Sequence, residues 1–256
     1  MSKRIAICIS GHMRNYNDQS ISNNFFAFKE HLSHFGEVDI FVASWNYQNT
    51  QNCWSASHNL SLCDSYKIQI DPILISEHYK SVATKIFDYD FYSSDNSPLK
   101  YQYFTNNKYN WDERGIYNDI IHSTKMLFLI YEANLLKSVY ANMLNITYDW
   151  VFRIRPDHLF DLKEIKEYID LNKLDPDKLY MPGKNDRLAF GSNHNMNIYC
   201  SSIYRLINIF NNNIFGDPET VLQSCTKQLI NIENIVYTPM FGHLLTENRQ
   251  TQLRLR

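Results

Sequence analysis

The chain has 256 residues, of which 44% are hydrophobic, and its 25 basic and 27 acidic side chains give a formal net charge of −2. This length and apolar content allow a sizeable buried core, which argues against a disordered chain. The balanced charge provides no global basic field, so we expect no nucleic-acid partner and at most peripheral contact with a membrane. Any anionic ligand must therefore be bound by a local group of side chains.

The chain contains five cysteines, at Cys8, Cys53, Cys63, Cys200 and Cys225. Their odd number and the absence of a CxxC pair argue against a disulfide framework and against a cysteine-rich zinc site. Residues 1–9 are basic and then only briefly apolar, which favours a first strand over a signal peptide. We expect a cytoplasmic protein that at most contacts the inner face of the membrane.

The N-terminal part shows the strand, helix, strand order that opens a doubly wound sheet. Residues 4–10 form a β-rich apolar run that stops at Ser10, as a buried strand followed by a ligand-facing loop would. Apolar residues then recur at helical spacing over about 20–35, and a second apolar run follows at 38–43. This pattern predicts an α/β fold with a parallel core.

The middle of the chain combines long polar segments with one clear helix. Residues 46–65 and 88–112 lack a period and predict long loops, and 66–75 predicts a third strand. The pattern over 118–144 predicts a helix, and 149–155 predicts the next strand. Further on we expect a surface helix at 161–171, a short strand at 179–181, a helix or strand-helix pair at 197–209 and a helix at 218–228.

The segment YDWVFRIRPDHLF, residues 148–160, carries the most chemistry. Because strand side chains alternate, Arg153 and Arg155 share one face, roughly 7 Å apart. A buried guanidinium requires an anionic partner, and arginine forks fit phosphate oxygens in pairs. A diphosphate at the carboxyl end of the strand is one such partner. An internal carboxylate, such as Asp157 or Asp186, is the other.

Asp157 follows the strand directly, where the chain leaves the sheet. A carboxylate there could hold a divalent ion that clamps a diphosphate, or accept a hydrogen bond from a sugar hydroxyl. The alternative is that Asp157 caps the next turn, as an Asp after a Pro often does.

Four segments in order along the chain are CISGHMRNY (8–16), DIFVASW (39–45), YDWVFRIRPDHLF (148–160) and NDRLAFGS (185–192). With them the chain resembles the GT-A-type glycosyltransferases of bacterial capsule and lipo-oligosaccharide loci. The resemblance implies a GT-A-like, Rossmann-type mixed sheet flanked by helices in a single domain. About 1–160 would be the nucleotide-binding half and about 161–256 the acceptor side.

The resemblance also implies an activity, which is the transfer of a sugar from a nucleotide-diphosphate donor to a surface polysaccharide. The acceptor would be an oligosaccharide or a lipid-linked saccharide. Ser10, Gly11 and Arg14, in the loop after the first strand, would border the nucleotide. A glycine there also lets backbone approach a ligand, and an arginine three residues later can reach a phosphate or a base; an ordinary strand-exit turn is the alternative.

The Arg-Pro-Asp sequence at 155–157 lies where such enzymes carry an Asp-x-Asp metal motif. This chain departs from that motif, because Arg155 stands in the position of the first Asp. Arg153 and Arg155 could therefore neutralise the leaving diphosphate in place of Mg²⁺ or Mn²⁺. If a divalent ion binds, Asp157 and His243 are the candidate ligands.

The remaining candidates concern the sugar and the acceptor. Trp45 could stack on a nucleobase or a sugar, or pack in the core. Gly191 and Ser192 belong to a strand-adjacent loop that could hold sugar hydroxyls, or could form a plain turn.

An inverting transfer requires a general base, for which Asp186 and Glu219 are the candidates. For Glu219 the alternative is a favourable charge at a helix N-terminus.

Two other classes of function share these features. One is a non-catalytic sugar- or nucleotide-binding module with a degenerate metal motif, and the other is a transferase of a different phosphate-linked group. A catalyst should present a second carboxylate at the same site as Asp157, whereas a binding module has no need of one.

Overall fold

A computed structural model describes residues 2–14, 16–49, 67–93, 116–183, 185–212, 217–239 and 241–244. The strands of its main sheet are β1 (Lys3–Ser10), β2 (Gly36–Trp45), β5 (Ala83–Phe87), β6 (Trp150–Ile154), β8 (Leu179–Met181), β9 (Leu188–Ser192) and β10 (Ile235–Tyr237). They lie in the order β10-β8-β9-β6-β1-β2-β5. β9 is antiparallel to both of its neighbours, and the other pairs are parallel.

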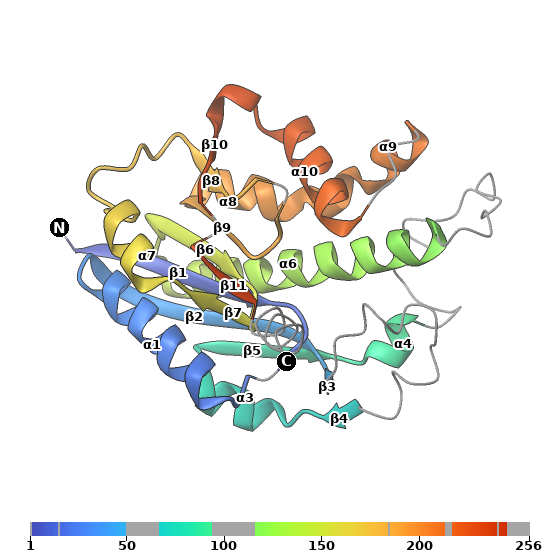
Figure 1. The fold of residues 1–256 in the computed structure, drawn as a ribbon, viewed down its shortest axis with the longest axis horizontal. Helices are drawn as coiled ribbons and strands as arrows, with labels where there is room; N and C mark the ends of the chain where they lie inside the picture. Colours follow the sequence, from blue (N-terminus) through green and yellow to red (C-terminus); the bar gives the residue numbers. More distant parts are fainter. Residues whose placement is uncertain are drawn as a thin grey trace, which may run out of the picture.

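Helices cover both faces of this sheet (Figure 1). The α-helices are α1 (Gln19–Ser33), α3 (Pro72–Tyr79), α4 (Tyr89–Ser93), α6 (Ile116–Leu144), α7 (Leu162–Tyr168), α8 (Asn193–Cys200), α9 (Leu206–Asn211) and α10 (Pro218–Leu229). Two 3₁₀ helices, η1 (Ser201–Arg205) and η2 (Ile232–Asn234), and two small ribbons complete the described part. The ribbons pair β3 (Tyr47–Asn49) with β4 (Lys67–Gln69) and β7 (His158–Phe160) with β11 (Gly242–Leu244). The expected α/β class, with one mixed sheet flanked by helices, is confirmed.

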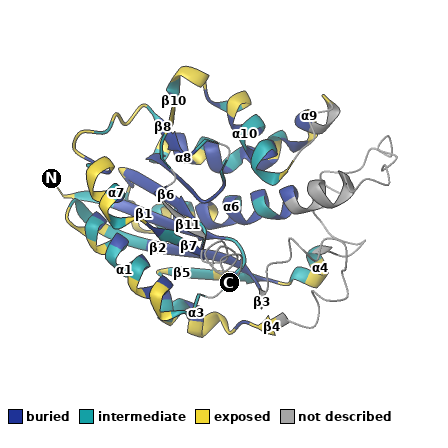
Figure 2. Ribbon diagram, in the orientation of Figure 1, coloured by how far each residue is buried: buried dark blue, intermediate teal, exposed yellow. Residues whose placement is uncertain are grey.

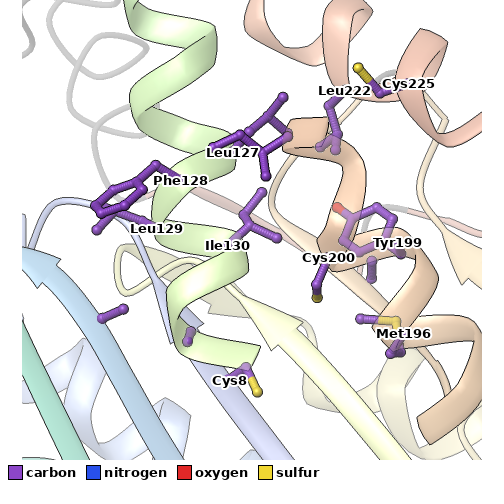
Figure 3. Close-up of a cluster of buried hydrophobic side chains, with 14 of the residues drawn as sticks. Cys8, Leu127, Phe128, Leu129, Ile130, Met196, Tyr199, Cys200, Leu222 and Cys225 are labelled. Carbon is purple, nitrogen blue, oxygen red and sulfur yellow. The ribbon is translucent and has the colours of Figure 1, made fainter. Parts of the chain in front are cut away.

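The alternation of side chains along β1 divides the core into two layers. Ile5, Ile7 and Ile9 face the layer that contains α1, while Ala6 and Cys8 face the layer that contains α6. Both sets are fully buried, and Figure 2 shows β1, β6 and β9 as mostly buried strands. Figure 3 shows how α6, α8 and α10 close the second layer over Cys8. The parallel strands are therefore apolar on both faces, as a sheet covered on both sides requires.

The start of β2 depends on the smallest side chain. Gly36 pairs with Lys3 of β1, and a Cβ added to it would lie 1.9 Å from the Lys3 carbonyl oxygen. No side chain can approach a backbone oxygen so closely. Gly36 therefore fixes how near β1 and β2 come at this point.

The predicted strand at 66–75 is wrong. The structure has only the short β4 there, followed by helix α3, because Asp71 caps the helix through a 2.8 Å hydrogen bond from the Ile73 amide and Pro72 occupies the first turn. The edge strand beside β2 is instead β5, over 83–87, which the sequence pattern did not indicate.

The other predicted elements correspond to observed ones. Helices were expected where α1, α6, α7 and α10 form, and strands where β1, β2, β6 and β8 form. The loops expected at 46–65 and 88–112 lie mostly outside the described residues, apart from β3 and α4. The segment at 197–209 is helical throughout.

In the described part of the chain, no helix is both long enough and apolar enough to cross a bilayer.

Candidate functional site

The carboxyl ends of β1 and β6 lie side by side, because these two strands are parallel neighbours. β1 ends at Ser10, and Gly11 turns the chain with φ +139°, a conformation that favours glycine. A Cβ on Gly11 would lie 3.3 Å from the Pro156 ring, so the two strand exits pack against each other. This is the edge of an α/β sheet where ligands are usually bound.

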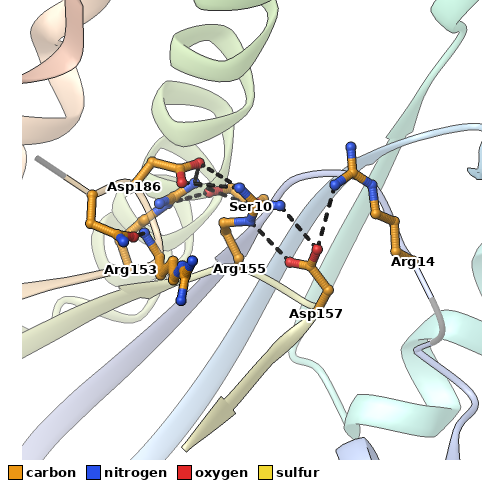
Figure 4. Close-up of polar contacts among 8 residues, drawn as sticks. Ser10, Arg14, Arg153, Arg155, Asp157 and Asp186 are labelled. Carbon is orange, nitrogen blue, oxygen red and sulfur yellow. Dashed lines mark hydrogen bonds and ion pairs between the residues drawn. The ribbon is translucent and has the colours of Figure 1, made fainter. Parts of the chain in front are cut away.

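Six side chains form a network here, which we call the ion cluster: Ser10, Arg14, Arg153, Arg155, Asp157 and Asp186 (Figure 4). At its centre the Arg155 guanidinium donates from Nε and Nη2 to the two oxygens of Asp157, at 2.9 Å each. Its Nη1 donates to Asp186, at 3.0 and 3.2 Å from the two oxygens. Arg155 therefore bridges two carboxylates.

Arg153 lies deeper, with 1% of its side chain exposed. Its Nε donates to Ser10 Oγ at 2.8 Å, and its Nη2 lies 3.8 Å from Asp186. Val151 of the same strand faces the α6 layer, while Trp150, Phe152 and Ile154 face the α1 layer, as alternation predicts. Both arginines therefore contact the internal carboxylate Asp186, one of the partners expected for them.

Arg14 approaches the cluster from the loop after β1. Its Nη1 lies 3.6 Å from Asp157 Oδ2, a longer contact than those of Arg155. Its side chain is 18% exposed, whereas that of Asp157 is 1% exposed. Arg14 is thus held to Asp157 by a longer contact than Arg155 is, and its exposure is close to the 16% of Arg155.

The two aspartates are held ionised. Burial alone would raise the pKa of Asp157, but the guanidinium groups of Arg155 and Arg14 outweigh it and hold that pKa at about 2. Burial opposes ionisation of Asp186 too, and Arg155 and Arg153 lower its pKa in the same way. A carboxylate with a lowered pKa is a weak base, so Asp186 is poorly suited to the general-base role that we considered for it.

Glu219 has the opposite character. It lies in the first turn of α10, and burial, followed by the charge of Asp186, raises its pKa while Arg155 opposes the rise. Its carboxylate is therefore within electrostatic reach of the ion cluster. Of the two candidate bases, Glu219 is the one whose pKa is shifted toward the range that proton transfer near neutral pH requires.

The lowered pKa of Asp157 predicts a specific pH dependence of stability. A group whose pKa is about 2 when folded, against an ordinary 3.8, stabilises the fold above pH 3.8 and loses this effect as the pH falls toward 2. We expect wild type to lose about 2 kcal/mol more than Asp157→Asn over this interval. Urea unfolding at pH 5, 4, 3 and 2 measures it, and parallel curves for the two proteins would contradict the expectation.

The residues do not fit the divalent metal site that the resemblance implied. Both oxygens of Asp157 already accept hydrogen bonds from Arg155. The backbone of His243 lies in β11 opposite Leu159, and its side chain is outside what the structure describes. Across the described residues, no group of three or more His, Cys, Asp or Glu side chains is placed to hold a metal ion.

Three further candidates lie elsewhere. Trp45 is 1% exposed and stacks on Phe128 with ring centroids 5.9 Å apart, which is the core-packing alternative. The segment at 188–192 is not a loop but strand β9, and because β9 is antiparallel, Gly191 and Ser192 lie opposite the start of β6. They are therefore at the far end of the sheet from the ion cluster, where Ser192 caps α8.

Tyr79 is a residue near the cluster that the sequence did not indicate. It ends α3, is 1% exposed, and its hydroxyl has no hydrogen-bond partner among the described residues. Burial, and next the charge of Asp157, raise its pKa. Tyr79 was missed because 66–75 was assigned to a strand. The helix start at Asp71-Pro72 is the signal that could have placed Tyr79 at the end of a helix.

Comparison with known protein families and with curated proteins gives no match for this chain.

Proposed function

We propose that the protein is a glycosyltransferase that moves a sugar from a nucleotide-diphosphate sugar to a bacterial surface polysaccharide, such as capsule or lipo-oligosaccharide. The observation that carries the proposal is the ion cluster, with its three arginines, at the carboxyl ends of β1 and β6. The position of the cluster agrees with the ligand edge of α/β sheets. The four motif segments of the sequence support a GT-A-like arrangement of this sheet.

In this proposal Arg14 meets the diphosphate of the donor, and its guanidinium fork matches phosphate oxygens. In a transfer that inverts the anomeric centre, Glu219 takes the proton of the acceptor hydroxyl. The hydroxyl oxygen then bonds to the anomeric carbon while the bond from that carbon to the diphosphate oxygen breaks. The leaving diphosphate keeps the electron pair, and Arg14 compensates its charge.

The partners follow from this chemistry. The donor is a nucleotide-sugar, and the acceptor is an oligosaccharide or a lipid-linked saccharide. The second of these would place the reaction in the cytoplasm at the inner membrane face.

We expect Arg14→Ala to abolish stabilisation by the donor nucleotide. A ligand that binds only the folded state at 100 times its Kd stabilises it by about 2.7 kcal/mol. Melting temperatures across a panel of nucleotide diphosphates and nucleotide-sugars test this, with Arg4→Ala as the matched control. Arg4 lies near the start of β1, at the opposite end of the strand from the loop that carries Arg14, and it pairs with Glu37 at 3.0 Å.

A shift in wild type and in Arg4→Ala that is lost in Arg14→Ala supports the donor site. A shift that survives in all three proteins would place the nucleotide elsewhere, and no shift with any nucleotide would remove the basis of the proposal.

For catalysis we expect Glu219→Gln to lower the rate of sugar transfer by about 10²- to 10⁴-fold while nucleotide binding is kept, because the amide cannot accept the proton. The measurement is donor consumption with a saccharide acceptor, alongside the melting-temperature panel. Asp217→Asn, at the cap of the same helix, is the control for helix stability. Equal losses in both variants would point to a structural role for Glu219.

A non-catalytic sugar- or nucleotide-binding module is the second candidate. It is favoured by the engagement of both Asp157 and Asp186 with Arg155, because a carboxylate bound in this way is poorly placed to act as a base. Nucleotide binding without consumption of any donor, unchanged in Glu219→Gln, would select this candidate.

A further inference from the structure

We infer that Arg155 is the resident cation of the ion cluster, standing between two buried carboxylates, and that the site therefore uses no divalent metal. The consequence for sugar transfer rests on the proposed function. The role of Arg155 as a cation does not, because it follows from the contacts alone.

The geometry of these contacts resembles that of an ion shared by two carboxylates. One guanidinium reaches all four carboxylate oxygens, at 2.9 and 2.9 Å for Asp157 and at 3.0 and 3.2 Å for Asp186. The Nε and Nη2 edge of the guanidinium faces Asp157, and Nη1 faces Asp186. The planar group therefore donates to both carboxylates at once.

The burial of the two acids makes such a cation necessary. Counted over the whole residue, Asp157 is 0% and Asp186 is 5% exposed to solvent. Two carboxylates that share a buried site cannot both stay ionised without a positive charge between them. A divalent ion could supply that charge, but it would have to take oxygens of Asp157 that Arg155 already occupies, against the repulsion of the guanidinium.

The other two arginines do not replace Arg155. Arg14 lies 3.6 Å from Asp157, and Arg153 lies 3.8 Å from Asp186. Both distances are longer than any of the four contacts of Arg155, the longest of which is 3.2 Å. Removal of Arg155 would therefore leave the negative charges of Asp157 and Asp186 compensated more weakly, through these longer contacts.

The test compares melting temperatures of wild type, Arg155→Ala and Arg155→Ala/Asp186→Asn, each with EDTA and with Mn²⁺, and with no nucleotide present. We expect wild type to respond to neither addition. We expect Arg155→Ala with EDTA to melt about 10 °C lower than wild type. Mn²⁺ should raise its melting temperature by about 5 °C, and the second substitution should recover part of the loss without metal.

Several results would overturn the inference. Equal responses of wild type and Arg155→Ala to Mn²⁺, whether both rise or neither does, would show that the guanidinium does not hold a cation position. A double variant no more stable than Arg155→Ala would show that charge is not what Arg155 contributes. If Arg155→Ala fails to fold, folding of the double variant supports the inference, and failure of both, even with Mn²⁺, overturns it.

These measurements stay separate from those on the proposed function. Nucleotide binding could fail while the cation exchange holds, and that result would leave Arg155 as a resident cation in a protein of another activity.

Discussion

Replacement of Asp157 by alanine is expected to lower the free energy of unfolding by about 3–5 kcal/mol, the usual cost of breaking a buried ion pair from one side. Asp157 is fully buried and accepts two hydrogen bonds from Arg155, with Arg14 close by. Its removal leaves two guanidinium groups with reduced compensation in a site from which water is largely excluded. Urea unfolding at neutral pH, followed by circular dichroism, measures the loss.

The matched control is an aspartate in an exposed ion pair. Asp170 lies 2.8 Å from Lys173, whose side chain is 83% exposed. We expect Asp170→Ala to leave stability unchanged within error, because water and salt screen such pairs. If Asp157→Ala costs no more than Asp170→Ala, the ion cluster contributes nothing to the stability of the fold.

A second large effect is expected at Gly36. A Cβ there would lie 1.9 Å from the Lys3 carbonyl oxygen and 2.8 Å from the Lys3 nitrogen, and both are backbone atoms that no rotamer change can move. Gly36→Ala must therefore separate β1 from β2, two neighbouring parallel strands of the main sheet. We expect the free energy of unfolding to fall by about 3 kcal/mol or more, or no folded protein to form.

Gly183→Ala is the control that separates this clash from conformational preference. Gly183 has φ +36°, and an added Cβ would meet no atom within 4 Å. We expect Gly183→Ala to lower the free energy of unfolding by about 1 kcal/mol, from backbone strain alone. A comparable loss in both variants would mean that the close approach of the two strands is not what Gly36 provides.

Much of the fold could be predicted from local pattern. β1, β2 and β6 are buried on both faces and read as apolar runs, and α6 shows a long helical period. The segment at 66–75 could not be read in this way, since its apolar residues fit a strand while the Asp71-Pro72 pair starts a helix. The capping pair decides the outcome, and it carries little weight in a hydrophobicity pattern.

The site was only partly predictable. Proximity of Ser10, Arg14 and the Arg153–Asp157 segment follows from two parallel strands that end together. Asp157 and Asp186 were both named as possible internal partners of the arginines, and Arg155 contacts both. The return of Asp186 to this edge does not follow from the pattern, because it depends on the direction of β9, which no sequence period reveals. The same reversal moves Gly191 and Ser192 away, although they lie only a few residues after Asp186 in the chain.

The return of the chain through β9 also sets the order in which the ion cluster can be completed during synthesis. Asp186 follows Arg155 by 31 residues, so it leaves the ribosome after both Arg155 and Asp157. Until then the nascent cluster holds three arginines against one aspartate. Asp186 comes just before β9, the strand that lies between β6 and β8. The excess of positive charge in the cluster therefore falls from two to one as that strand is added.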